Sequence, residues 1–88
     1  MLKVKKGFIL RRMLNEYMVV AVGEASLHFN GMIRLNATGA FLWEALSEGA
    51  TEAELVQRLL SRFEDLDEAT AKADLNEFLD TVRFALEG

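Results

Sequence analysis

The side chains that could carry out catalysis are few in this sequence, and they lie far apart. His28 is the sole imidazole, there is no cysteine, and the fourteen acidic residues fall mainly on expected solvent-facing helix surfaces. Acid–base and nucleophilic catalysis require convergent groups, and a metal site requires several ligands. The glycines match neither the P-loop nor the dinucleotide-binding pattern. The sequence therefore predicts a protein that is not an enzyme and has no catalytic residue, metal site or cofactor.

Composition and charge indicate one small domain and restrict its partners. The 88 residues are 51% hydrophobic and include no cysteine, so stability must come from one apolar core. Residues 1–36 hold six basic and two acidic side chains, a net charge of +4, whereas residues 37–88 hold four basic and twelve acidic ones, a net charge of −8. Helices this acidic would be repelled by the phosphate groups of a nucleic acid. The apolar runs are too short to cross a bilayer. We expect a cytoplasmic domain without a nucleic-acid or membrane partner.

The first half of the chain predicts a small antiparallel sheet. Its three β-prone runs lie at residues 8–14, 17–22 and 32–35. Asn15-Glu16 is a connection of hairpin length, and Asn15 tolerates a positive φ. The composition of the next connection indicates a loop, although Asn30-Gly31 could instead turn a second hairpin between residues 27–29 and the third run.

The second half of the chain predicts three helices. They lie at about residues 38–47, from residue 51 onward, and at about residues 67–86. Asn36 is expected at the start of the first helix, and Thr51 with Glu54 forms a capping box for the second. The third helix has one apolar stripe, and Phe84 projects opposite that stripe. Strands followed by helices predict a single α+β domain over residues 1–88.

One segment carries more specific information than the rest of the chain. Its sequence is Gly31-Met32-Ile33-Arg34-Leu35-Asn36-Ala37-Thr38-Gly39-Ala40-Phe41-Leu42-Trp43. The apolar strand that ends in Leu-Asn, the small-residue helix entry and the Leu-Trp pair resemble the central signature of PqqD-like proteins. The flanking strands and helices agree in order, so the resemblance covers nearly the whole chain. It departs at residues 23–30, which are longer than the tight turn of the shortest members, and at the C-terminus, where the usual apolar residues are missing.

The resemblance implies binding rather than catalysis. PqqD-like proteins, or RiPP recognition elements, are named after coenzyme PQQ synthesis protein D; they have a small winged-helix-like fold. They capture the leader of a ribosomally made precursor peptide and present it to a modifying enzyme, often a radical SAM maturase. The leader adds as a strand beside the third strand, in a groove with the third helix, and an unpaired strand edge permits such addition. The peptide-binding residues expected on this basis are Met32, Ile33, Arg34, Leu35, Lys72, Leu75, Asn76, Leu79, Val82 and Arg83.

These residues divide between groove and core. Alternate residues of the third strand face opposite sides, so one pair packs in the core. Leu75 and Val82 lie at the centre of the helical stripe, where burial is the better expectation. The stronger binding candidates lie on the flank of the stripe: Lys72, Asn76, Leu79 and Arg83. The cations on this flank would favour an acidic leader.

A second function remains open at this point. The chain could be a regulatory or homodimerising winged-helix-like domain that binds another folded protein. An exposed Phe84 would favour that function, because it would give a folded partner an apolar contact on the far side of the third helix.

Overall fold

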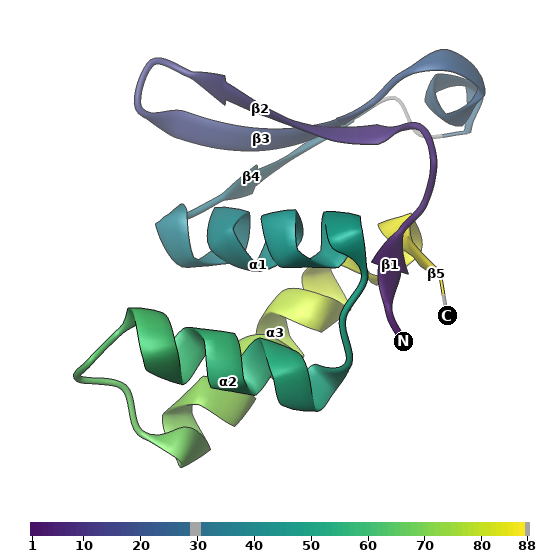
Figure 1. Ribbon diagram of the computed structural model, residues 1–88. Helices are drawn as coiled ribbons and strands as arrows, with labels where there is room; N and C mark the ends of the chain where they lie inside the picture. The colour runs from purple at the N-terminus through teal and green to yellow at the C-terminus, as the bar shows by residue number, and fades with distance from the viewer. Residues whose placement is uncertain (29–30, 88) are drawn as a thin grey trace.

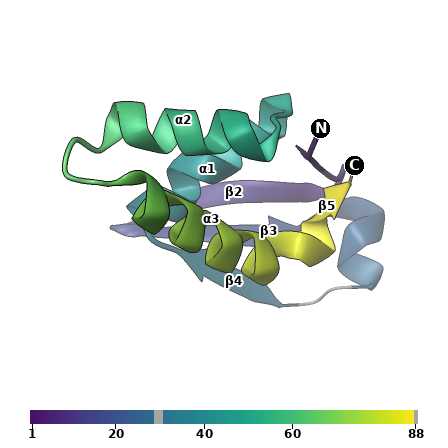
Figure 2. The ribbon, with the colours of Figure 1, turned by 90° about the horizontal axis from the view of Figure 1, so that it is seen from below.

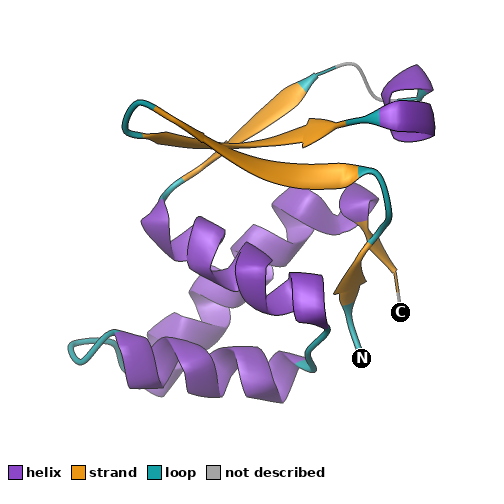
Figure 3. Ribbon diagram, turned by 45° about the horizontal axis from the view of Figure 1, so that its top comes forward, coloured by secondary structure: helices purple, strands orange, loops and turns teal. Residues whose placement is uncertain are grey.

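The computed structural model describes residues 1–28 and 31–87, which form two layers (Figure 1). One layer is an antiparallel sheet of β2 (Phe8–Met13), β3 (Glu16–Ala21) and β4 (Met32–Leu35), in that order. The other layer comprises α1 (Ala37–Glu48), α2 (Glu52–Arg62) and α3 (Glu68–Val82). Figure 2, viewed from the helical side, shows the helices in front of the sheet, and Figure 3 shows the sheet lying on one side of the helices. The predicted α+β architecture, with antiparallel strands before three helices, is confirmed.

The register of the sheet decides which strand residues face the helices. Val19 lies opposite Ile33 and is fully buried, with 0% of its surface exposed. Residues directly opposite each other share a face of the sheet, and the face alternates along each strand. Ile33 and Leu35 therefore face the helices, while Met32 and Arg34 lie on the outer face. The alternation on β4 that the sequence left open is resolved in this way.

The hairpin between β2 and β3 turns at Leu14-Asn15, one residue earlier than the predicted Asn15-Glu16. Leu14 has a positive φ of 58° and is 94% exposed. The predicted turn would have set Arg12 opposite the buried Val19, where the observed register places an apolar side chain. Apolar burial on the inner face therefore outweighs the local preference of asparagine for the left-handed conformation.

The connection from β3 to β4 contains a short 3₁₀ helix, η1 (Gly23–Leu27). Leu27 therefore belongs to a helical turn and not to the strand of the alternative hairpin. Residues 29 and 30, on which that hairpin depended, lie outside the described residues. Within the described part of the chain, β4 pairs with β3 alone.

The predicted helix starts are confirmed by their hydrogen bonds. The Asn36 side chain accepts a hydrogen bond of 2.7 Å from the amide three residues later, at the start of α1. The capping box of α2 is complete: the Thr51 amide donates to Glu54 at 3.0 Å, and the Thr51 hydroxyl accepts from the Glu54 amide at 3.1 Å. The hydrogen bond from the Thr51 amide lowers the pKa of the Glu54 carboxyl group. Asp67 caps α3, and the Thr70 amide lowers its pKa in the same way.

The end of α3 differs from the prediction, which continued the helix to about residue 86. The helix ends at Val82, and the chain continues as the 3₁₀ turn η2 (Arg83–Ala85) and the strand β5 (Leu86–Glu87). Strand β5 pairs antiparallel with β1 (Lys3–Val4), so the two ends of the chain meet (Figure 1). In the sequence, the helical spacing of apolar residues continues past the end of α3 into the 3₁₀ turn, and a two-residue strand is too short to show a pattern of its own. The sequence therefore does not reveal this second sheet.

Phe84 is not the exposed residue that the sequence predicted. It is half-buried, and its ring lies edge-on to Phe8 with 5.3 Å between ring centroids and an interplanar angle of 76°. The turn η2 departs from the helical rotation of α3 and directs the ring toward β2. This ring contact joins the turn after α3 to the start of the main sheet, because Phe84 lies in η2 and Phe8 is the first residue of β2.

The core lies between the sheet and all three helices. Trp43 is its largest member and is only 2% exposed. Its buried companions are Val19, Leu42, Ala45, Leu46, Ala50, Leu55, Val56, Leu59, Ala71, Leu75, Phe78, Leu79, Val82, Ala85 and Leu86. Among the described residues, no helix is long and apolar enough to span a membrane.

Candidate functional site

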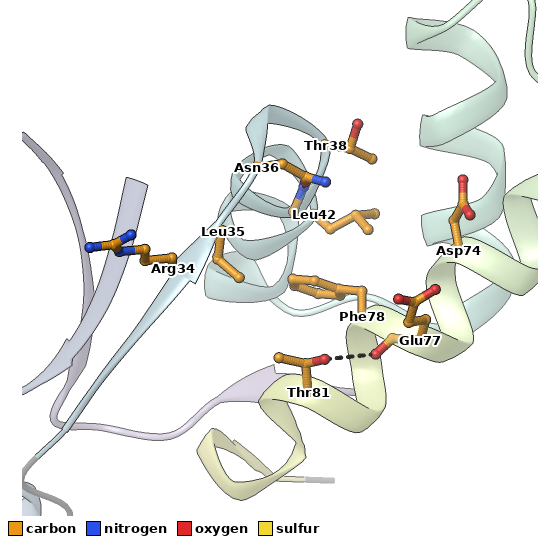
Figure 4. A pocket seen from close by; sticks show the side chains of 10 residues that line it. Arg34, Leu35, Asn36, Thr38, Leu42, Asp74, Glu77, Phe78 and Thr81 are labelled. Carbon is orange, nitrogen blue, oxygen red and sulfur yellow. Dashed lines mark hydrogen bonds between the residues drawn. The ribbon is translucent and has the colours of Figure 1, made fainter. Parts of the chain in front are cut away.

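A groove lies between the end of β4, the start of α1 and one face of α3. It has a volume of about 350 Å³, and its lining residues are Arg34, Leu35, Asn36, Thr38, Gly39, Leu42, Asp74, Glu77, Phe78 and Thr81. Figure 4 shows the strand and α1 on one side of the groove and α3 on the other. Residues that are forty positions apart in sequence therefore line one surface.

The floor of the groove is apolar. Leu42 and Phe78 are buried members of the core that also line the groove, and Leu35 adds a half-buried side chain. Gly39 lets the first turn of α1 lie close to the end of β4, because a Cβ at this position would lie 3.3 Å from the Cβ of Leu35 and 3.3 Å from the Oδ1 of Asn36. An apolar side chain that entered the groove would lose its hydration against this floor.

Strand β4 forms an open edge beside the groove. The order β2-β3-β4 places it at the margin of the sheet, and no other described strand lies against its free side. Consecutive residues of an edge strand point their N–H and C=O groups alternately toward the neighbouring strand and away from it. The outward groups of β4 can therefore accept a further extended chain as a fourth strand.

The wall formed by α3 is acidic. Asp74 and Glu77 are exposed, lie one helical turn apart and line the groove. The Thr81 hydroxyl lies beyond them and donates to the Glu77 carbonyl oxygen at 3.0 Å (Figure 4). At the opposite rim, the guanidinium of Arg34 forms an ion pair with Glu16 across 3.8 Å. The α3 wall thus carries two negative charges.

The structure brings two of the predicted strand residues into this groove and places the others nearby. Arg34 and Leu35 line it. Ile33 faces inward and is half-buried, and Met32 faces outward with 57% of its surface exposed. The strand part of the predicted site therefore surrounds the open edge.

The predicted helix residues lie elsewhere. Leu75, Leu79 and Val82 are buried in the core, so Leu79 is not the flank residue that the helical projection suggested. Lys72 and Asn76, with Leu75 at its floor, line a different hollow, between α2 and α3. Arg83 lies in η2, and its Nη2 lies 3.3 Å from the Asp80 carboxylate. The helical projection separated the two flanks correctly, and packing turns the Asp74 and Glu77 flank, not the flank of Lys72 and Asn76, toward β4.

The groove residues that the sequence analysis missed were present in two patterns. Asp74, Glu77, Phe78 and Thr81 are spaced i, i+3, i+4 and i+7, which defines one face of a helix. The missed residues of the other wall are Asn36, Thr38, Gly39 and Leu42. They belong to the segment whose family resemblance was recognised, so that resemblance could have indicated them.

No three His, Cys, Asp or Glu side chains gather into a potential metal site within residues 1–28 and 31–87. His28 lies in an exposed turn after η1 and is not among the residues that line the groove. The lining of the groove thus offers apolar surface, hydrogen-bonding groups and two carboxylates, a set suited to holding an extended peptide.

These features define a class: a small α+β domain with an open strand edge beside a helix-walled groove. The family model for coenzyme PQQ synthesis protein D (PqqD) matches residues 13–83, and the chain belongs to this family. The fold is similar to that of TbiB1, solved in complex with the TbiA(beta) leader peptide, with a TM-score of 0.75 and 23% identity. That similarity covers 98% of this chain and 95% of TbiB1. No curated protein sequence matches the chain.

Proposed function

We propose that this chain is a non-catalytic cytoplasmic module that captures the leader of a ribosomally synthesised precursor peptide and presents it to a modifying enzyme. The leader adds as a strand to β4, and its side chains enter the groove between β4 and α3. The modifying enzyme is a radical SAM maturase, as is common in the family. The observation that carries this proposal is the open edge of β4 beside a groove with an apolar floor.

Two further observations support the proposal. The chain belongs to the PqqD family, and TbiB1, whose fold is similar, has been solved with a leader peptide. Strand addition also suits a partner of variable sequence, because main-chain hydrogen bonds supply affinity while pockets select side chains. Because this chain would bind the leader, a separate modifying enzyme could act on the rest of the precursor.

The alternative function, a regulatory or homodimerising domain that binds a folded protein, loses its main support. It depended on an exposed Phe84, whereas the ring is half-buried and packs on Phe8. A homodimer remains a proposal, but the exposed aromatic contact that would have favoured it is lost.

Binding should depend on the leader alone. In titration calorimetry, the isolated leader should bind within about threefold of the full precursor, because the strand and its pockets contact only that segment. A precursor lacking its leader should show no heat of binding. Mass spectrometry after incubation with this chain alone should give an unchanged precursor mass. Tight binding of the leaderless precursor, or a new covalent product, would contradict the proposal.

A further inference from the structure

The carboxylates of Asp74 and Glu77 have no cationic partner among the described residues. The three ion pairs in that part of the chain join Arg34 to Glu16, Lys72 to Glu68 and Arg83 to Asp80. Arg34, the one cation among the residues that line the groove, is thus paired with a different carboxylate. The groove therefore contains two negative charges that the protein itself leaves available to a ligand.

These carboxylates line the same groove as the apolar floor. Asp74, Glu77 and Phe78 follow one another on the groove face of α3, and Figure 4 shows the Glu77 carboxylate near Phe78 and the Asp74 carboxylate farther along the helix. Four helical residues rise by about 6 Å, and two residues of an extended strand by about 6.7 Å. In an added strand that runs along α3, alternate side chains can therefore lie beside Phe78 and beside Asp74 at the same time.

We infer that the groove selects leader peptides that carry a lysine or arginine two residues from a large apolar residue. The basic side chain lies between Asp74 and Glu77, and the apolar side chain packs on Leu42 and Phe78. This inference rests on the proposed function, because it assigns the side-chain specificity of the same strand-addition site. It also reverses the acidic leader expected from Lys72 and Arg83, which lie outside the groove.

The charge of the whole helical half acts in the same direction. Residues 37–88 hold twelve acidic and four basic side chains, so the field near α3 attracts a cationic peptide. The ion pairs would form at a partly exposed rim, where each contributes modestly and is screened by salt. The apolar contact and the main-chain bonds supply the remaining affinity, and the carboxylates distinguish one leader from another.

A random ten-residue display library selected on the wild-type chain tests this inference. The selected peptides that shift the β4 amide resonances should contain Lys or Arg two positions from Leu, Ile, Met or Phe. For such a peptide, the D74N/E77Q variant should bind roughly five- to tenfold more weakly at low salt, since two exposed ion pairs are lost. The difference should shrink at about 0.5 M salt.

The matched control removes two charges elsewhere. Glu64 and Asp65 are exposed between α2 and α3 and do not line the groove, so the E64Q/D65N variant should bind within about twofold of wild type. A peptide with its basic residue replaced by methionine should bind the wild type and D74N/E77Q equally. If a peptide bound at β4 is held equally by D74N/E77Q and by wild type, the inference fails while the proposed function stands. If no selected peptide shifts the β4 amides, the proposed function fails as well.

Discussion

Replacing Trp43 with alanine should lower the free energy of unfolding by about 3–5 kcal/mol, a large part of the 5–15 kcal/mol that holds a domain together. Trp43 is the largest side chain of the core and is 2% exposed. No disulfide supports this fold, because the chain contains no cysteine. The cavity left by the indole would therefore weaken the one core on which both layers depend.

Urea unfolding followed by far-ultraviolet circular dichroism measures this loss. Fluorescence is unsuitable, because Trp43 is the sole tryptophan. Its neighbour Glu44 is exposed on the same helix, so Glu44→Ala serves as the control and should change the free energy of unfolding by less than about 0.5 kcal/mol. A loss below about 1 kcal/mol for Trp43→Ala would show that the core is not organised as described.

Filling the groove should abolish most peptide binding without unfolding the protein. Thr81 is exposed and lines the groove, and its hydroxyl donates only to the Glu77 carbonyl oxygen of its own helix. In Thr81→Trp, the indole can pack on the apolar floor and occupy the space of the added strand. We expect leader binding to weaken by roughly thirtyfold or more, because both the floor contact and the strand edge become obstructed.

Ala73→Trp is the matched control for this prediction. Ala73 is exposed on α3 and does not line the groove, so the same enlargement leaves the site open. Calorimetry with the leader peptide should show wild-type affinity for Ala73→Trp, and both variants should melt close to wild type. Undiminished binding by Thr81→Trp, or an equal loss in both variants, would place the peptide on another surface.

Local chemistry made much of the fold predictable. The start of each helix is set by side chains within three residues of it, such as Asn36, Thr51 with Glu54, and Asp67. The three main strands followed from β-prone runs of ordinary length. The features that failed depend on distant parts of the chain. The β2–β3 turn is set by which residue lies opposite Val19, and the β1–β5 pair joins the two ends of the chain.

The site was predictable only where one segment determines it. Strand β4 and the helix entry after it are contiguous, and the sequence analysis placed the open edge there. The wall of α3 requires knowing how that helix is rotated against the sheet. Its apolar stripe fixed which face enters the core, but both flanks of a buried stripe satisfy the same pattern. Packing brings the flank of Asp74 and Glu77 to β4 and leaves Lys72 and Asn76 beside α2.

Hydrogen exchange of the β4 amides, with and without the leader peptide, tests the central claim most directly. Alternate amides of residues 32–35 point to the open edge and should exchange quickly in the free protein. At a leader concentration about 100 times its Kd, these amides should exchange roughly 100-fold more slowly, since exchange then requires dissociation of the added strand. The amides of the other edge strand, β2, should be unchanged. Unchanged exchange on β4, with new protection on β2 or around η2, would contradict strand addition at this edge.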